Sequence, residues 1–152
     1  MAEKRIARTS WPETPVPKGV KELAGYFLSL LDTNTDDAGV QLASRVFTPD
    51  AVFMTSSATF KGAEEIKESR TEAWRVVERR FHEIIKVFSA KDDASDLLMI
   101  GNAVLNLKNG KEVKGDFIAH MVLDKVATPD VRISYFQVWG DTGPMIRAMQ
   151  DN

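Results

Sequence analysis

The chain has 152 residues, of which 43% are hydrophobic and 28% are charged. This length predicts a single domain, and a chain of this size can bury about 70% of the surface that it exposes when unfolded. The absence of cysteine excludes disulfides, thiolate nucleophiles and cysteine-based metal sites. A formal net charge of −2 argues against broad binding to nucleic acids or anionic membranes, which needs a basic surface.

The first 17 residues are rich in charged side chains and contain three prolines. This composition predicts an extended or disordered arm over residues 1–17. The alternative is a strap that pins Ile6 or Trp11 onto the body of the protein. The sequence shows neither the apolar stretch of a signal peptide nor the about 18 apolar residues that a membrane span needs. We therefore expect a soluble cytoplasmic protein.

The next part of the chain has helical periodicity. Apolar residues recur every three or four positions over residues 18–31 and predict a helix. A second helix is expected over residues 36–47, where a proline-containing turn ends it. Two short strands, 51–55 and 58–61, should follow. A longer helix is predicted from residue 62 to about residue 80, with glutamates in its first turns.

Beyond residue 80 the pattern becomes strand-like. Segments 81–90, 96–107, 112–126 and 131–139 are rich in Val, Ile, Phe and Tyr, and short turns separate them. Four long strands with short connections predict an antiparallel meander, and a short last helix is expected at 145–150. This order of elements predicts an α+β fold, in which helices cover one face of a curved antiparallel sheet.

The two last long strands carry apolar residues on both faces. In segment 112–126, Phe117, Ala119 and Met121 alternate with Ile118 and Val122. A sheet face that meets water should instead be polar. We therefore expect both faces to be covered, one by the helices and the other by a second subunit, which predicts a homodimer.

Four segments carry a further pattern: residues 47–53 (Phe-Thr-Pro-Asp-Ala-Val-Phe), 60–62 (Phe-Lys-Gly), 80–84 (Arg-Phe-His-Glu-Ile) and 138–141 (Val-Trp-Gly-Asp). Together with the order of elements, they resemble the nuclear transport factor 2-like superfamily, which includes ketosteroid isomerase, scytalone dehydratase and the SnoaL-like polyketide cyclases of secondary metabolism. The resemblance covers about residues 20–149. It implies a cone-shaped, strongly curved, mostly antiparallel sheet wrapped around an apolar pocket. Residues 18–152 are then a single SnoaL-like domain.

The sequence also departs from these relatives. The position of the base aspartate of ketosteroid isomerase falls at Thr55, and that of its acidic oxyanion donor falls near Ala119. Steroid-type isomerisation with that residue set is therefore not expected. Scytalone dehydratase matches at His82, but its second catalytic histidine falls in a segment that has Asn102 and no histidine.

Histidine is the side chain best suited to proton transfer near neutral pH, and the chain has two. The resemblance implies a sheet order in which one strand separates the strands of His82 and His120, so we expect the two histidines to reach one cavity from strands about 10 Å apart. Asp116 lies on the same strand face as His120 but about 13 Å along the strand, so the two side chains cannot touch. We expect Asp116 to orient the ligand or to serve as the base. The alternatives are a partly solvated His82 at a strand end and a hydrogen-bonded His120 in the core or at a dimer interface.

Further side chains are expected to line the pocket. An arginine on the apolar face of the third helix suits a ligand carboxylate or phenolate, although such arginines often extend to the surface instead. The expected lining residues are Tyr26, Phe53, Arg70, Trp74, Asn102, Gln137 and Trp139. No phosphate-binding loop, His-x-x-x-His pair or metal-spaced carboxylate cluster appears in the sequence, so we expect no cofactor and no metal.

These observations favour a cofactor-independent isomerase, cyclase or dehydratase. Such an enzyme moves protons on a small aromatic or polyketide-like carbonyl compound and needs only an acid, a base and a dry site. The alternative is a non-catalytic module on the same fold that binds a small molecule or another protein. Convergent polar groups in the pocket would favour the enzyme, and a pocket filled by aromatic side chains would favour the module.

Overall fold

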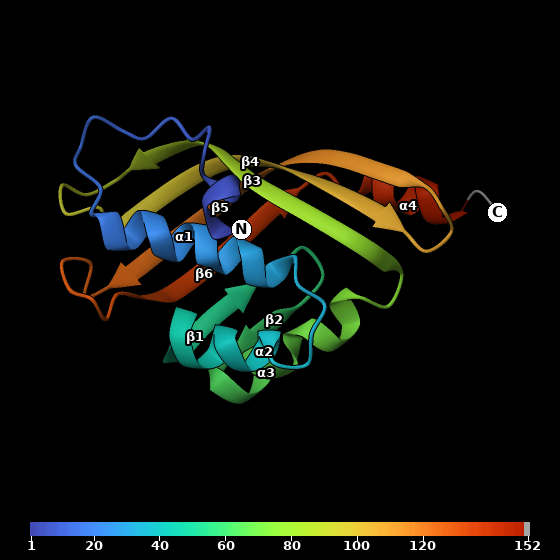
Figure 1. Cartoon of the computed structure of the whole chain (residues 1–152), viewed down its shortest axis with the longest axis horizontal. Helices are drawn as coiled ribbons and strands as arrows, with labels where there is room; N and C mark the ends of the chain where they lie inside the picture. Colours follow the sequence, from blue (N-terminus) through green and yellow to red (C-terminus); the bar gives the residue numbers. More distant parts are fainter. Residues whose placement is uncertain (151–152) are drawn as a thin grey trace.

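The computed structural model describes residues 1–150 and shows one curved six-stranded sheet with helices packed on its inner face (Figure 1). The α+β class and the antiparallel meander expected from the sequence are confirmed. The last two residues of the expected domain, 151 and 152, lie outside the described part. In chain order the elements are η1 (Ala2–Arg5), α1 (Lys18–Leu31), α2 (Ala38–Gln41), the π-helical turn η2 (Leu42–Val46), β1 (Phe47–Met54), β2 (Thr59–Lys61), α3 (Gly62–Ala73), β3 (Val77–Ser89), β4 (Asp96–Leu107), β5 (Glu112–Asp124), β6 (Arg132–Gly140) and α4 (Gly143–Gln150).

The strand order across the sheet is β2-β1-β6-β5-β4-β3. Neighbouring strands from β3 to β6 pair antiparallel, as does β1 with β2, whereas β1 pairs with β6 in parallel. The long strand β3 therefore forms one edge of the sheet, and the three-residue strand β2 forms the other. An edge strand leaves backbone groups unpaired, so β3 needs partners from elsewhere in the chain.

The apolar face of α1 packs on the inner face of the sheet. Val20, Phe27 and Leu28 are almost completely buried there. The Phe27 ring makes edge-to-face contacts with Phe47, Phe53 and Phe136, with ring centroids 4.8–5.9 Å apart. Phe53 was expected to line the ligand pocket, but it belongs to this aromatic core and is 1% exposed.

Two element boundaries differ from the sequence-based expectation. The helix α3 ends at Ala73, seven residues early, because the Arg80 guanidinium donates a hydrogen bond to the Ala73 carbonyl and the chain turns there. The second expected helix is reduced to α2 and η2, and β1 begins at Phe47. Pro49 is tolerated in β1 because the pairing with β6 shifts register between Phe47 and Val52.

Candidate active site

The candidate active site is an aspartate–histidine pair on the inside of the domain. His82 lies on β3, where it pairs with Ala103 of β4, and Asp32 directly follows α1. The His82 Nδ1 atom lies 2.5 Å from Asp32 Oδ1, and the His82 backbone N–H donates to Asp32 Oδ2 at 2.8 Å. The side chain of Asp32 is 1% exposed and that of His82 is 18% exposed. The carboxylate therefore fixes the imidazole in an almost dry environment.

The end of α1 positions the Asp32 carboxylate. The Asp32 backbone N–H closes the last turn by donating to the Leu28 carbonyl at 3.1 Å, and the next N–H, of Thr33, donates to the Leu30 carbonyl at 3.2 Å. The side chain of Asp32 meets β3 at this end of the helix. The sequence showed Asp32 only as part of a polar stretch that ends the first helix. An acidic residue at a helix end was the available signal, but nothing local indicates that a strand fifty positions later pairs with it.

Arg5 holds the second oxygen of the same carboxylate. Its Nη2 atom lies 3.1 Å from Asp32 Oδ2, and its guanidinium group stacks 4.1 Å from the centroid of the Phe81 ring. Arg5 is only 8% exposed, although it comes from the N-terminal arm. Asp32 thus has Oδ1 on the imidazole and Oδ2 on Arg5 and the His82 amide. Sequence reasoning missed Arg5 because it lies in a segment whose composition suggested disorder.

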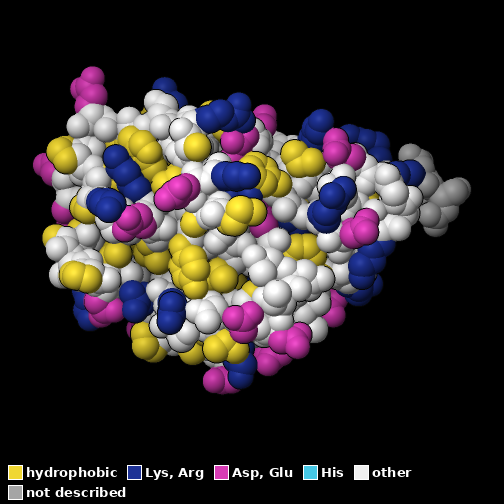
Figure 2. Space-filling model, in the orientation of Figure 1, with side chains coloured by type: hydrophobic (Ala, Val, Ile, Leu, Met, Phe, Trp, Pro, Cys, Tyr) yellow, Lys and Arg dark blue, Asp and Glu magenta, His cyan; other side chains and the backbone are white. Residues whose placement is uncertain are grey.

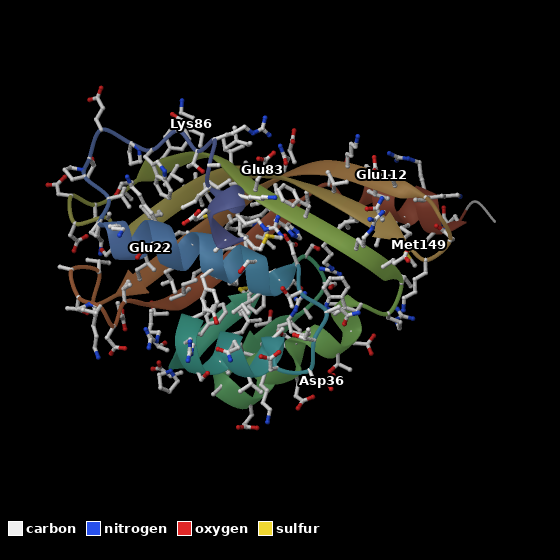
Figure 3. The ribbon with its side chains drawn as sticks, viewed as in Figure 1. Glu22, Asp36, Glu83, Lys86, Glu112 and Met149 are labelled. Atoms are coloured by element: carbon white, nitrogen blue, oxygen red, sulfur yellow. The ribbon has the colours of Figure 1, made fainter. Side chains whose placement is uncertain are left out.

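The N-terminal arm is docked, contrary to the expectation that residues 1–17 are extended or disordered. Ser10 pairs with the edge of β3: its N–H donates to the Ile85 carbonyl at 2.8 Å, and its carbonyl accepts from the Val87 N–H at 3.0 Å. Arg8 forms an ion pair with Glu83, a residue that Figure 3 shows on β3 beside the arm. The arm thus behaves as a strap, because it satisfies the backbone groups that an edge strand leaves open.

Contact with α1 also fixes the start of the arm. Figure 1 shows η1 between α1 and β3. A Cβ atom on Gly25 of α1 would lie 2.8 Å from the Ala2 carbonyl oxygen, so only glycine allows η1 to approach this closely. The arm and α1 cover the pair from this side, and no histidine side chain is visible on the same face in Figure 2.

Two further guanidinium groups lie close to the pair. Arg70 donates to the Leu31 carbonyl at 2.6 Å, and Arg80 donates to the Ala73 carbonyl, so each caps the end of a helix. Burial and, to a smaller extent, the charge of Arg80 lower the pKa of Arg70 to about 10, although the charge of Asp32 acts in the opposite direction. Burial also lowers the pKa of Arg80, again against the effect of Asp32. Arg80 stacks 4.9 Å from the ring centroid of Trp74.

His120 does not reach the same site as His82, so the expected convergence of the two histidines is wrong. His82 pairs with Ala103 of β4, whereas His120 pairs with Leu98 of the same strand. Five positions along a regular strand place Ala103 and Leu98 on opposite faces, about 16 Å apart. His120 therefore lies on the outer face, where its Nε2 atom is 2.8 Å from Asp96 Oδ1.

A scan against protein-family models finds no match, and a comparison with curated protein sequences finds none either. Solved structures do match. A putative SnoaL-like polyketide cyclase from Jannaschia sp. CCS1 superposes with a TM-score of 0.68 at 10% identity, over 93% of this chain and 98% of that one. A hypothetical protein with a ketosteroid isomerase-like fold from Catenulispora acidiphila, in complex with trimethylamine, superposes with a TM-score of 0.67 at 13% identity, over 88% of this chain and 92% of that one. A hexachlorocyclohexane dehydrochlorinase, LinA type 2, superposes with a TM-score of 0.66 at 16% identity, over 81% of this chain and 83% of that one.

The chain has the nuclear transport factor 2-like fold. The resemblance noted in the sequence is thus confirmed, together with the strongly curved sheet that it implied. Identities of 10–16% establish the fold alone. This fold hosts different chemistries, so function has to be argued from the site.

The remaining residues expected at the site are dispersed over the nuclear transport factor 2-like domain. Asp116 pairs with Asn102 on the outer face and is exposed, so neither residue faces the Asp32–His82 pair. Gln137 and Trp139 lie opposite His120 and Ile118 on that same outer face. The Tyr26 hydroxyl donates to Gln41 Oε1 at 3.1 Å. Of the expected lining residues, Arg70 and Trp74 belong to the polar cluster around the pair.

Two cavities in the described part of the fold lie away from the pair. One of about 530 Å³ opens between η2, β1 and the turn that joins β5 to β6, and Phe47, Pro49, Lys125 and Arg132 are among its lining residues. The other, of about 220 Å³, lies near Arg75, Leu107 and Met149. Neither of these two cavities has Asp32 or His82 among its lining residues.

Within residues 1–150, no three His, Asp or Glu side chains gather closely enough to hold a metal ion. The same residues include no helix with the length and hydropathy to cross a membrane.

Proposed function

We propose that the protein is an enzyme that removes a proton from carbon in a small-molecule substrate, with His82 as the base. The observation that carries this proposal is the contact of 2.5 Å between His82 Nδ1 and the buried Asp32 carboxylate. When Nδ1–H donates to the carboxylate, the lone pair of the imidazole is on Nε2, which is free to accept a proton. Asp32 orients the ring and stabilises the imidazolium that forms.

The surroundings of the imidazole suit this chemistry. Ala103 faces the ring from β4, and the Phe117 ring lies edge-on to it with centroids 6.0 Å apart. A water-poor site strengthens the electrostatic interactions that stabilise a carbanion or enolate. Isomerisation, aldol-type cyclisation and elimination all begin with such a proton removal, so a small aromatic or polyketide-like carbonyl compound remains the proposed substrate.

Structures of the same fold support an enzyme without indicating which reaction it catalyses. Those that match include proteins named as a polyketide cyclase, a dehydrochlorinase and an epoxide hydrolase-like protein. The second candidate is a non-catalytic binding module. The burial of the pair favours it, because the side chains of Asp32 and His82 are only 1% and 18% exposed.

The first test of the proposal needs no substrate. The chain has only two histidines, so ring-nitrogen correlation spectra of the ¹⁵N-labelled protein resolve each of them. We expect the His82 ring to carry its hydrogen on Nδ1, and we expect the Asp32→Asn variant to lose this preference. A hydrogen on Nε2 in the wild-type protein would leave no base at the proposed atom and would contradict the proposal.

The second test measures proton abstraction directly. Deuterium exchange at the activated carbons of acetylacetone and 2-tetralone in D₂O reports enolate formation by NMR. We expect His82→Gln to lower the catalysed exchange by about 10²–10⁴, the usual contribution of a general base. His120→Gln is the matched control, because that histidine lies on the outer face, and it should leave the exchange unchanged. Equal rates in the His82→Gln variant and the wild type would rule out the assigned role.

We also propose that the protein forms a homodimer through the outer face of its sheet. Five large apolar side chains on this face are 38–47% exposed, which is unusual for a single soluble domain. A second copy of the same face would remove them from water. The five are Phe88, Leu98, Ile100, Ile118 and Trp139.

Ile118→Lys should dissociate this dimer at micromolar concentration, because a buried ammonium group without a partner is strongly unfavourable. Ile146→Lys is the control, since Ile146 is 50% exposed on α4 and is not part of the outer face of the sheet. Sedimentation velocity measures the outcome. A monomeric wild-type protein at micromolar concentration, or equal dissociation by both variants, would exclude this interface.

A further inference from the structure

We propose that Arg80, Trp74 and Arg70 form an anion-binding subsite beside His82, so that the substrate carries a carboxylate or a similar small anionic group. The place of this subsite in catalysis depends on the proposed function, whereas its ability to bind an anion does not.

The strand β3 places Arg80 next to the base. Arg80 and His82 pair with Leu105 and Ala103, which alternate along one face of β4. Both side chains therefore lie on the inner side of the sheet, about 7 Å apart along β3. Arg79, between Val77 and Arg80, pairs with Asn106 and is exposed on the other side. An anionic group held at Arg80 is thus close enough for the same small molecule to reach the imidazole.

Three buried N–H groups of this cluster have no hydrogen-bond partner. They are Trp74 Nε1, Arg80 Nε and Arg70 Nε. Trp74 is 8% exposed and Arg70 is 9% exposed, so water does not satisfy these groups freely. A buried donor without a partner costs free energy, and all three are donors that never accept. What is missing is therefore an acceptor, which a carboxylate supplies with two oxygens.

The charge of the region points the same way. Arg5, Arg70 and Arg80 bring three guanidinium groups to the neighbourhood of one carboxylate, Asp32, which already accepts from Arg5 and His82. The ends of α1 and α3, which accept from Arg70 and Arg80, contribute about half a negative charge each. A surplus of roughly one positive charge remains. One monovalent anion would balance it.

These features select the class of ligand. Guanidinium groups bind carboxylates with charge-assisted and often paired hydrogen bonds, and the indole N–H adds a neutral donor. A ligand with an ammonium group would be repelled, and a neutral amide would leave the surplus charge unbalanced. We therefore assign this subsite to an organic acid whose reacting carbon lies a few bonds from its carboxylate.

Benzoate is a suitable probe, and benzamide is its neutral counterpart of the same shape. The protein has three tryptophans, so three indole signals appear in a ¹H–¹⁵N spectrum, and Trp74→Phe identifies the relevant one. We expect benzoate to shift the Trp74 indole signal in a saturable way and benzamide to bind at least tenfold more weakly. Arg80→Gln should weaken benzoate binding by tenfold or more, whereas the control Arg79→Gln should bind it like the wild type.

Arg80→Lys keeps the positive charge and replaces Arg80→Gln in the benzoate titration if the glutamine variant does not fold. It should retain part of the binding. No saturable shift with benzoate up to 50 mM, equal affinity for benzamide, or equal weakening by Arg79→Gln would overturn the subsite. His82→Gln separates this inference from the proposed function. If the wild-type protein catalyses no exchange, while both the wild type and His82→Gln bind benzoate with the same affinity, the subsite is retained and the proposed enzymatic function is refuted.

Discussion

Replacing Arg5 with glutamine should lower the free energy of unfolding by about 3 kcal/mol. Removing one partner of a buried ion pair typically costs about 3–5 kcal/mol, because the remaining charge is left without compensation. The side chains of Arg5 and Asp32 are 9% and 1% exposed, so this pair is of the buried kind. We expect a loss at the lower end of this range, because the backbone N–H and the ring Nδ1 of His82 still contact the Asp32 carboxylate in the variant. Urea denaturation measures the difference.

Lys4→Gln is the matched control for Arg5→Gln. It removes the same charge from the neighbouring residue of η1, but Lys4 is exposed, and a surface charge contributes at most about 1 kcal/mol. The expectation from composition alone was that deletion of residues 1–17 leaves the fold intact. The buried Arg5 and the pairing of Ser10 with β3 now indicate that deletion destabilises the protein at least as much as Arg5→Gln. Equal stability of the two point variants would show that the ion pair contributes nothing.

Gly101→Ala should destabilise the protein by about 3 kcal/mol, at the upper end of the about 1–3 kcal/mol that overpacking usually costs. A Cβ atom at this position of β4 would lie 2.3 Å from Cζ of Phe117 and 2.5 Å from the backbone oxygen of Glu83. The aromatic ring can rotate away, but the carbonyl belongs to the neighbouring strand and can move only with β3. Since Phe117 lies edge-on to His82, the substitution should also change the ring signals of His82.

Gly115→Ala provides the comparison for Gly101→Ala. Gly115 lies on β5, and nothing lies within 4 Å of the Cβ atom that alanine would add there. We expect this variant to unfold within about 0.5 kcal/mol of the wild type, as surface substitutions usually do. Thermal unfolding of the two variants under identical conditions tests the difference. A Gly101→Ala protein as stable as the Gly115→Ala protein would mean that β3 and β4 separate without cost at this point.

The four long strands could be predicted from sequence because alternation of apolar residues is a local property. The boundary of α3 could not. Ala73, Trp74 and Val77 continue a helical spacing, while the end of the helix is set by Arg80, which folds back onto the Ala73 carbonyl. The start of β1 was missed for a similar reason. A proline normally ends a strand, and only the register shift with β6 makes room for Pro49.

The candidate site was only partly accessible from sequence. His82 could be singled out by residue type and by its place at the start of a strand. Asp32 and Arg5 could not, because they reach His82 from segments that are distant in the chain. For β5, alternation separates the face of Phe117 from that of His120 but does not say which one is inside. Asp116, which shares the His120 face and is exposed, was the residue that marked that face as the outer one.

The docked arm also has a consequence for the order in which the chain is made. Ribosomes add about 5–20 residues per second, so Arg5 and Ser10 leave the ribosome roughly 4–15 s before the middle of β3 does. The N-terminal arm has therefore left the ribosome before β3, the strand on which it docks, emerges. An uncovered edge strand is prone to pair with other chains, and β3 is one of the two longest strands in the sheet. The early synthesis of its cover shortens the time for which a nascent chain is open to aggregation.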